Sequence, residues 1–259
     1  MTNIFDLTGR TAVVTGGGTH IGRSIAMALA RFGARVHITG RRADMCEEAA
    51  AAIQRQQLHC TAHACDASDE TAMERLCAEV AAETGRLDIL IANAAGRGGR
   101  ALAPTIGREQ WDETFRLTVT TAAVSAQAAV RYMDPQVGGR IIFVGSIHGF
   151  LGADPRMYGR GYSRSGSDYH AAKGAIVNLT RSLACELGPV GVNVNCVSPG
   201  QIPPGSTDDT TTERFRLSTP LGICGVPSDL DGVVVLLSSA ASRFITGQNI
   251  VVDGGWSAW

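Results

Sequence analysis

Two hydrophobic patterns alternate along the chain. Short runs of β-branched and other apolar residues predict buried strands, and each run precedes a segment with apolar residues at helical spacing, such as Ile21, Ile25 and Leu29. Strands are expected at residues 11–15, 35–39, 59–64, 88–91, 140–144, 192–197 and 249–252, and helices at 21–32, 43–57, 70–84, 109–133, 169–187 and 230–238.

This alternation predicts an α/β fold. Strand–helix–strand units have right-handed crossover connections and form a parallel sheet that is covered by helices on both faces. We therefore expect a doubly wound, Rossmann-type sheet in a single domain over residues 1–259, since no Pro/Ser-rich linker divides the chain. Residues 150–168 and 200–218 look irregular. Long loops in compact domains usually carry function, so we expect an inserted active-site loop at 150–168 and a substrate lid at 200–218.

Composition excludes several classes of function. With 259 residues, 44% of them hydrophobic and 18% charged, the chain can bury a sizeable core. A formal net charge of −1 argues against a nucleic-acid partner, because no basic field is available to attract phosphates. The N-terminus has no basic start followed by an apolar run, and no apolar run is long enough to span a bilayer.

The cysteines favour a reducing compartment. There are seven, an odd number at irregular spacing, and we read them as free thiols in a cytoplasmic protein. His59, Cys60, His63 and Cys65 lie close together in the sequence, but a strand would place Cys60 on the opposite face from the others. No metal site is expected.

A glycine-rich turn joins the first strand to the first helix. Gly16, Gly18 and Gly22 let the chain turn tightly, so that backbone N–H groups at the helix start can meet a pyrophosphate. The spacing departs from the common dinucleotide fingerprint, because Ile21 stands where its third glycine would fall. His20 also lies in this turn.

Two arginines follow the second strand. In this architecture that position meets the adenosine ribose, where an acidic residue would accept the 2′-hydroxyl and an arginine suits a 2′-phosphate. Here the residues are Arg41 and Arg42, and the nearest acid is Asp44. The pattern predicts NADP(H) rather than NAD(H). The alternative is a pair of solvated arginines at a helix start.

Ser146, Tyr169 and Lys173 form a candidate catalytic group. Tyr169 and Lys173 are four residues apart and share one helix face. A neighbouring ammonium favours the phenolate, so the tyrosine can exchange a proton with a carbonyl oxygen. A serine hydroxyl can hold that same oxygen.

Taken together, these motifs resemble the single-domain short-chain dehydrogenase/reductase family. The resemblance runs from Leu7 to Gly255 and includes residues 92–96 after the fourth strand. It implies that Tyr169 is the acid/base, that Lys173 holds the nicotinamide ribose and that Ser146 orients the substrate oxygen. It also implies cofactor contacts at Asp66, Ala67, Asn93, Pro199, Gly200 and Ile202. Simpler roles remain open for Asp66, as a turn residue, and for Asn93, as a strand-end cap.

The chain departs from the family pattern in several places. His20 replaces a glycine of the nucleotide loop, and Thr118, a candidate catalytic residue, stands where many members have a helix asparagine. Pro204 stands where a threonine often binds the carboxamide. Ser146 and Tyr169 are 23 positions apart, about ten more than the family pattern leads us to expect.

The resemblance implies an NADP(H)-dependent enzyme that reduces a ketone or oxidises a secondary alcohol. The alternatives are a cofactor-binding sensor or scaffold without turnover, and a dehydration or epimerisation on the same fold. Arginines at 156, 160 and 164 in the inserted loop, with Arg97 and Arg100 opposite, suggest a lid that favours a polar substrate, anionic ones included. The competing reading is a solvated loop, or one docked on a neighbouring subunit. The family likeness also implies a homotetramer that pairs the small-residue faces of helices 109–133 and 169–187.

Overall fold

A seven-stranded parallel sheet forms the centre of the molecule. The computed structural model describes residues 3–158 and 165–259. The strands run in the order β3-β2-β1-β4-β5-β6-β7. They are β1 (Thr11–Thr15), β2 (Arg35–Gly40), β3 (Cys60–Ala64), β4 (Ile89–Ala92), β5 (Gly139–Val144), β6 (Val192–Pro199) and β7 (Asn249–Val252). The predicted strand positions are confirmed to within one or two residues at their ends.

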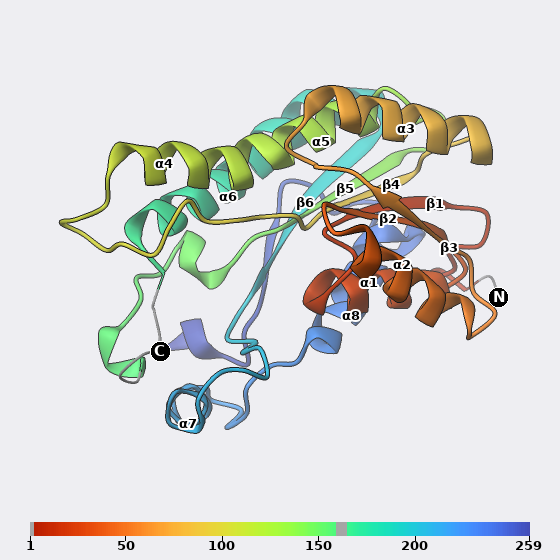
Figure 1. Cartoon of the computed structure of the whole chain (residues 1–259). Coiled ribbons are helices and arrows are strands. Elements are labelled where there is room, and N and C mark those ends of the chain that lie inside the picture. Colours follow the sequence, from red (N-terminus) through yellow and green to blue (C-terminus); the bar gives the residue numbers. More distant parts are fainter. Residues whose placement is uncertain (1–2, 159–164) are drawn as a thin grey trace.

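Helices cover both faces of the sheet (Figure 1). One face carries α1 (His20–Arg31), α2 (Ala43–Gln54) and α8 (Asp231–Ser238). The other carries α3 (Glu70–Thr84), α4 (Arg108–Phe115), α5 (Thr121–Val130) and α6 (Ser167–Leu187). The predicted doubly wound, Rossmann-type α/β fold is confirmed.

Two apolar cores lie between the sheet and its helical layers. Ala12 and Val14 point into the core beneath α1 and α2, whereas Val13 points into the core beneath α3 and α5. Because both faces are covered, every residue of β1 is buried. This explains why the strands read as continuous apolar runs and not as alternating patterns.

The sheet order also positions the site. Strand order reverses at β1 and β4, which lie side by side and lead into helices on opposite faces. In open parallel sheets the crevice beyond the carboxyl ends of the strands at this reversal is the usual ligand site. The loops that follow β1, β4, β5 and β6 all lie at this edge.

Two sequence-based expectations about elements are wrong. The expected continuous helix 109–133 is interrupted by a π-helical turn at Arg116–Thr120, which separates α4 from α5. The segment 200–218, expected to be irregular, contains α7 (Asp209–Leu217). Helix α7 forms because the Asp208 side chain accepts a hydrogen bond from the Thr211 backbone N–H at 2.8 Å and caps the first turn.

The segment 150–168 follows the expectation in part. It contains a 3₁₀ turn at Pro155–Met157, and α6 already begins at Ser167, so the non-helical connection is slightly shorter than expected. Residues 159–164 lie outside the described residues. Within the described part of the chain, no helix has the length and apolar character needed to cross a membrane.

Candidate active site

The turn after β1 is held in shape by Asn93 at the end of β4. The Asn93 side-chain amide donates hydrogen bonds to the carbonyl oxygens of Thr15 at 3.0 Å and Gly16 at 3.1 Å. Gly16 has a φ of +65°, a conformation that glycine adopts without strain. A side chain at Gly22 would collide with the Gly16 carbonyl. Asn93 therefore acts as a strand-end tie that shapes the nucleotide loop.

The start of α1 has the properties of an anion site. Its N-cap residue, Thr19, makes no side-chain cap, and no acidic residue lies in the first turn, so the first backbone N–H groups lack a protein acceptor there. Gly18 packs closely on Cys46 of α2. The Ile21 side chain is partly buried and packs against the core beneath α1 and α2. His20 is exposed and lines a cavity at this edge.

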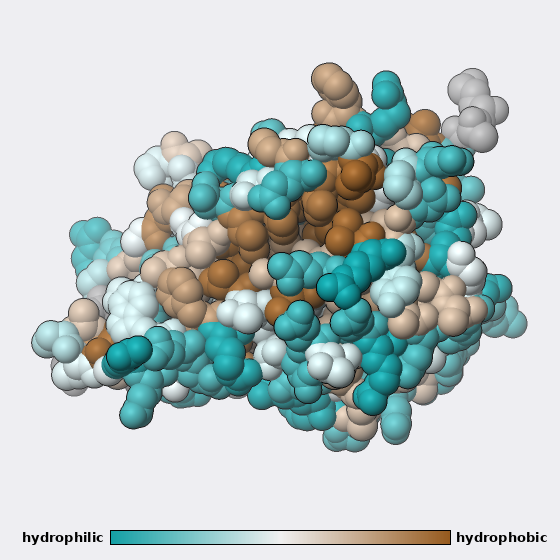
Figure 2. Space-filling model, turned by 90° about the horizontal axis from the view of Figure 1, so that it is seen from above, coloured by the Kyte–Doolittle hydropathy of each residue, from teal (hydrophilic) through white to brown (hydrophobic). Residues whose placement is uncertain are grey.

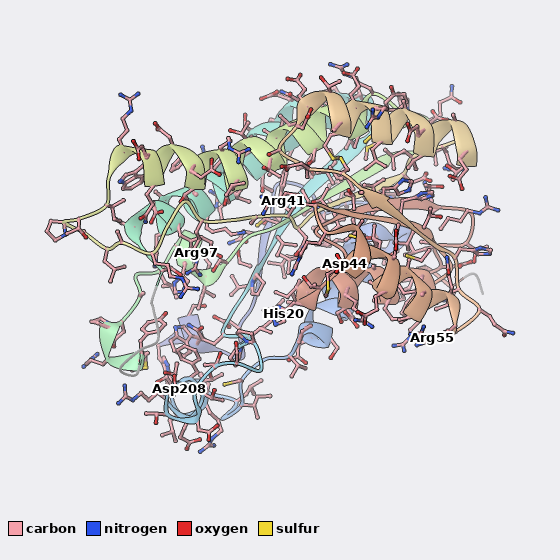
Figure 3. All side chains as sticks on the ribbon, in the orientation of Figure 1. His20, Arg41, Asp44, Arg55, Arg97 and Asp208 are labelled. Atoms are coloured by element: carbon pink, nitrogen blue, oxygen red, sulfur yellow. The ribbon has the colours of Figure 1, made fainter. Side chains whose placement is uncertain are left out.

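Basic residues flank the expected adenosine position. Arg41, labelled in Figure 3, and Arg42 are exposed after β2. Arg42 is the N-cap residue of α2. Hydrogen bonds from Ser68 lower the pKa of Asp66, with a further contribution from the Arg41 charge. Asp66 thus serves as a turn residue and also presents a carboxylate at this edge, whereas the side chain of the neighbouring Ala67 is buried.

Lys173 and Tyr169 project from the same face of α6. Lys173 is buried, and its ammonium donates a hydrogen bond to the Val144 carbonyl at 2.7 Å. The same ammonium lies 5.8 Å from the centroid of the Tyr169 ring. Ser146 follows β5, and its hydroxyl oxygen accepts a hydrogen bond from the His148 backbone N–H at 3.1 Å. The end of β5 and helix α6 therefore bring the three predicted catalytic residues together.

A cavity of about 410 Å³ opens beside these residues. Its lining includes five predicted site residues, His20, Ser146, Tyr169, Gly200 and Ile202. The remaining lining residues are Arg97, Ile147, His148, Tyr158, Ser165, Gln201 and Pro204. Pro199 ends β6, is buried and does not line the cavity. Gly200 is closely packed, because a Cβ there would lie 2.6 Å from the Asp253 Cα.

Arg97 places a positive charge over the tyrosine. Its guanidinium carbon lies 4.6 Å from the centroid of the Tyr169 ring. The segment that carries Arg97 is anchored, because the Gly98 N–H donates to the Thr114 hydroxyl at 2.8 Å, and that hydroxyl donates to Asp168 at 2.7 Å. Among the described residues that line the cavity, Arg97 is the one permanent cation.

Thr118 lies outside the cavity lining. It belongs to the π-helical turn, is buried, and its hydroxyl donates to the Gly96 carbonyl at 3.0 Å. This bond fixes the chain just before Arg97. In this structure the Thr118 hydroxyl therefore helps to hold the loop after β4, and a catalytic role for Thr118 stays a prediction.

The inserted loop does not bring Arg156 to the cavity. Arg156 pairs with Asp154 at 2.7 Å, and its side chain is 84% exposed. The loop instead rests on α7, where an Arg214 side-chain nitrogen donates to the carbonyls of Arg156 and Tyr158. The expected cations at 160 and 164 lie outside the described residues.

His148 is a cavity residue that no sequence motif indicates. Burial lowers its pKa to about 4, and the nearby His170 and Arg97 add to this effect. Its ring nitrogen Nδ1 is buried without a hydrogen-bond partner. The available signal was its position two residues after Ser146, where a strand end turns toward the site.

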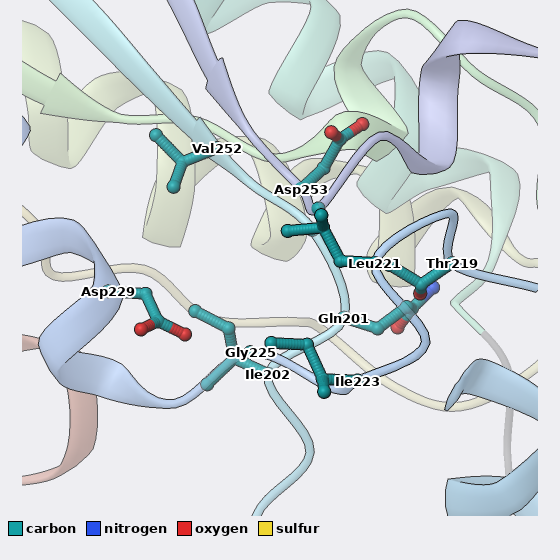
Figure 4. Close-up of a pocket in the computed structure, with 11 residues that line it drawn as sticks. Gln201, Ile202, Thr219, Leu221, Ile223, Gly225, Asp229, Val252 and Asp253 are labelled. Carbon is teal, nitrogen blue, oxygen red and sulfur yellow. The ribbon is translucent and has the colours of Figure 1, made fainter.

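A second, smaller cavity of about 260 Å³ adjoins the first and shares Gly200, Gln201 and Ile202 with it. Ile202, Leu221 and Ile223 give it apolar walls (Figure 4). No group of three or more histidine, cysteine, aspartate or glutamate side chains within residues 3–158 and 165–259 is arranged to hold a metal ion.

Comparisons with known proteins identify the family of this chain. A family model described as enoyl-(acyl carrier protein) reductase matches residues 17–257. The chain is 33% identical over 258 residues to gluconate 5-dehydrogenase of Gluconobacter oxydans, an alignment that covers 98% of this chain and 96% of the relative. It is also 33% identical to a sorbose reductase of Schizosaccharomyces pombe, with 99% of each chain covered.

A solved structure from Beutenbergia cavernae, described as an NAD(P)-dependent gluconate 5-dehydrogenase with bound NADP at low occupancy, superposes with a TM-score of 0.88. It shares 35% identity, and the match covers 99% of this chain and 100% of that chain. The similarity extends over the full length of the chain, in both sequence and structure. It identifies the chain as an oxidoreductase that acts on alcohol or carbonyl groups. The chain belongs to the short-chain dehydrogenase/reductase family.

Proposed function

We propose that this enzyme transfers a hydride between NADP(H) and a ketone or its secondary alcohol, with Tyr169 as the general acid/base. The observation that carries the proposal is the cavity beyond β5 and β6. Ser146 and Tyr169 line it, and Lys173 is buried beside Tyr169. His20 lines it from the start of α1, whose N-terminus has no side-chain cap.

The residues at the sheet edge fit a phosphorylated dinucleotide. The glycine turn has no room for side chains at Gly22, and the uncapped α1 N-terminus suits a pyrophosphate. Arg41 and Arg42 suit the 2′-phosphate that distinguishes NADP(H) from NAD(H). When bound, the cofactor would supply or accept the hydride. The solved relatives include a Pseudomonas aeruginosa structure described as a complex with NADP.

In the direction of reduction, the Tyr169 hydroxyl gives its proton to the substrate oxygen as negative charge develops there. The Ser146 hydroxyl donates a hydrogen bond to the same oxygen and fixes its position. Lys173 holds a positive charge beside Tyr169, and its bond to the Val144 carbonyl restricts where that charge lies. In oxidation the proton returns to Tyr169.

We also propose an anionic substrate that is bound by Arg97. A guanidinium can bind a carboxylate through two parallel hydrogen bonds, and Arg97 stands over the acid/base ring. Two of the relatives are named for gluconate, itself a carboxylate. In an Arg97→Gln variant, KM for a keto acid should rise about tenfold or more, and KM for a neutral ketone should change little. Equal changes for both substrates would refute this role.

The assembly that fits these features is a homotetramer. Figure 2 shows an apolar band across the helical face that contains α5 and α6. Small residues of α5 such as Ala123, and partly exposed leucines of α6 such as Leu179, lie on this side and would permit close helix pairing. Light scattering at micromolar concentration tests the proposal, and a monomer would contradict it.

The direct test is turnover with a panel of ketones and alcohols, followed by the absorbance of reduced nicotinamide. We expect NADPH to be consumed with at least one class of ketone, and NADPH to be used more efficiently than NADH. Tight NADPH binding with no turnover for any substrate would instead indicate a sensor or scaffold.

A further inference from the structure

His148 stands in the wall of the proposed active site, beside the residues that would hold the reacting carbonyl. Its backbone N–H donates to the Ser146 hydroxyl oxygen at 3.1 Å. Its ring packs edge-on to Tyr169, with ring centroids 6.3 Å apart. A substrate whose carbonyl oxygen lies between Ser146 and Tyr169 would therefore bring its neighbouring carbons close to this imidazole.

Neither ring nitrogen of His148 makes a hydrogen bond to a residue of the described part of the chain. Nδ1 is enclosed by protein, whereas Nε2 is not among the enclosed atoms and is therefore the ring nitrogen that a ligand in the cavity can reach. A buried polar group left without a partner is costly, and native proteins usually satisfy such groups. When a ligand fills the cavity and covers Nε2, the partner of this nitrogen is most simply a group of that ligand.

The neighbours of His148 fix the ring and keep it neutral. From α6, the His170 ring packs against it with centroids 4.4 Å apart, and His170 Nδ1 is held at 3.0 Å from the Leu151 carbonyl. From the loop after β4, the positive charge of Arg97 disfavours protonation of both imidazoles. The carboxylate of Asp168 favours protonation of His170 and so raises its pKa. That carboxylate accepts hydrogen bonds from Thr114 and Gln110. Burial is the largest cause of the low His148 pKa, about 4.

The chemistry of a neutral imidazole selects its partner. In one tautomer the reachable Nε2 is a donor and in the other an acceptor, and an alcohol hydroxyl can pair with it in both cases. A carboxylate offers only acceptors and is better matched by Arg97, on the other side of Tyr169. In this arrangement Arg97 suits an anionic group of the substrate, and His148 suits a hydroxyl group.

We propose that His148 is a specificity residue that recognises a hydroxyl group on a carbon near the reacting carbonyl, which makes hydroxy-ketones, and polyhydroxy acids above all, the preferred substrates. This inference rests on the proposed function. It goes beyond that function by naming the chemical group on the substrate and the residue that reads it.

The test compares a matched pair of substrates, 3-hydroxy-2-butanone and 2-butanone, which differ by one hydroxyl group. The unmutated enzyme should show a kcat/KM at least about tenfold higher for the hydroxy-ketone, since the analogue leaves a buried polar group unpaired. In His148→Phe, which keeps an aromatic ring but has no ring nitrogen, the ratio of the two kcat/KM values should fall toward one. His148→Asn, which keeps a donor and an acceptor, should restore part of the ratio.

The ratio separates recognition from a structural role. If His148 only supports the fold, its replacement lowers both kcat/KM values together and leaves the ratio unchanged, which would overturn the proposal. His59→Phe is the control, because His59 is an exposed histidine outside both cavity linings, and neither value should change. Equal kcat/KM values in the unmutated enzyme would also overturn the assignment of His148, while leaving the proposed function intact. Absence of turnover with every ketone would overturn both.

Discussion

Replacement of His37 should reduce the acid sensitivity of the fold. His37 lies on β2, is 2% exposed, and has its Nδ1 3.0 Å from Nε2 of His63 on β3. Burial lowers the pKa of His37 to about 4, and the His63 and Arg35 charges act in the same direction, against an opposing contribution from Glu83. The imidazole is therefore neutral in the folded protein at neutral pH.

The sign of the effect follows from which state binds the proton. The unfolded chain protonates this histidine near pH 6.5, whereas the folded chain does so only near pH 4. Between these values the unfolded state binds more protons, so the free energy of unfolding falls as the pH falls. A pKa difference of about 2.5 at about 1.4 kcal/mol per pH unit gives an upper limit of about 3.5 kcal/mol. Because the histidine is only half titrated at each end of this range, the change between pH 6.5 and 4 is about 3 kcal/mol.

Urea unfolding at a series of pH values measures this difference. His37→Gln has no titrating ring and can still bond to His63, so its loss of stability between about pH 6.5 and 4 should be smaller than that of the unmutated protein by about 3 kcal/mol. His59→Gln removes an exposed histidine and should match the unmutated slope. Parallel curves for the unmutated protein and His37→Gln would refute the reasoning.

Three further predictions concern the cofactor. Arg41→Ala should reduce the preference for NADPH over NADH at least tenfold in Kd measurements, because a charge-assisted phosphate contact is worth about 1.5–3 kcal/mol. Arg55 is an exposed arginine at the end of α2, and Arg55→Ala should leave this preference unchanged. Gly22→Ala should abolish NADPH binding by fluorescence titration, because the added methyl group collides with the Gly16 carbonyl. Lys173→Ala should lower kcat and raise the Kd for NADPH together, and a change in only one of them would count against its double role.

The sheet was predictable because burial on both faces leaves a clear signal. Each strand is a short apolar run, and the segments between the strands have apolar residues at helical spacing. The order of strands and helices along the chain and the α/β fold class therefore follow from the sequence alone. The interruption of helix 109–133 was not predictable, because residues of the π-helical turn such as Leu117 and Val119 have the same apolar character as a regular helix. Helix α7 was missed because its sequence is polar, although the Asp208 cap is a recognisable start signal.

The site residues divide in a similar way. Ser146, Tyr169 and Lys173 could be found because their types and spacing specify the chemistry. Their distances to one another depend on β5 and α6 meeting, which no local pattern encodes. Thr118 has a hydroxyl that looks available in the sequence, yet the fold engages it with the Gly96 carbonyl. His148, in contrast, belongs to no motif in the sequence, and only the structure reveals that its ring nitrogen Nδ1 has no hydrogen-bond partner.

The substitution Tyr169→Phe tests the central claim most directly. It removes one hydroxyl group and leaves the ring, the buried Lys173 and the nucleotide turn in place. With a ketone that the unmutated enzyme reduces, the rate of NADPH consumption should fall by at least about a hundredfold, while the Kd for NADPH stays close to the unmutated value. Near-normal turnover by the Tyr169→Phe enzyme would contradict the assignment of Tyr169 as the acid/base and the mechanism built on it.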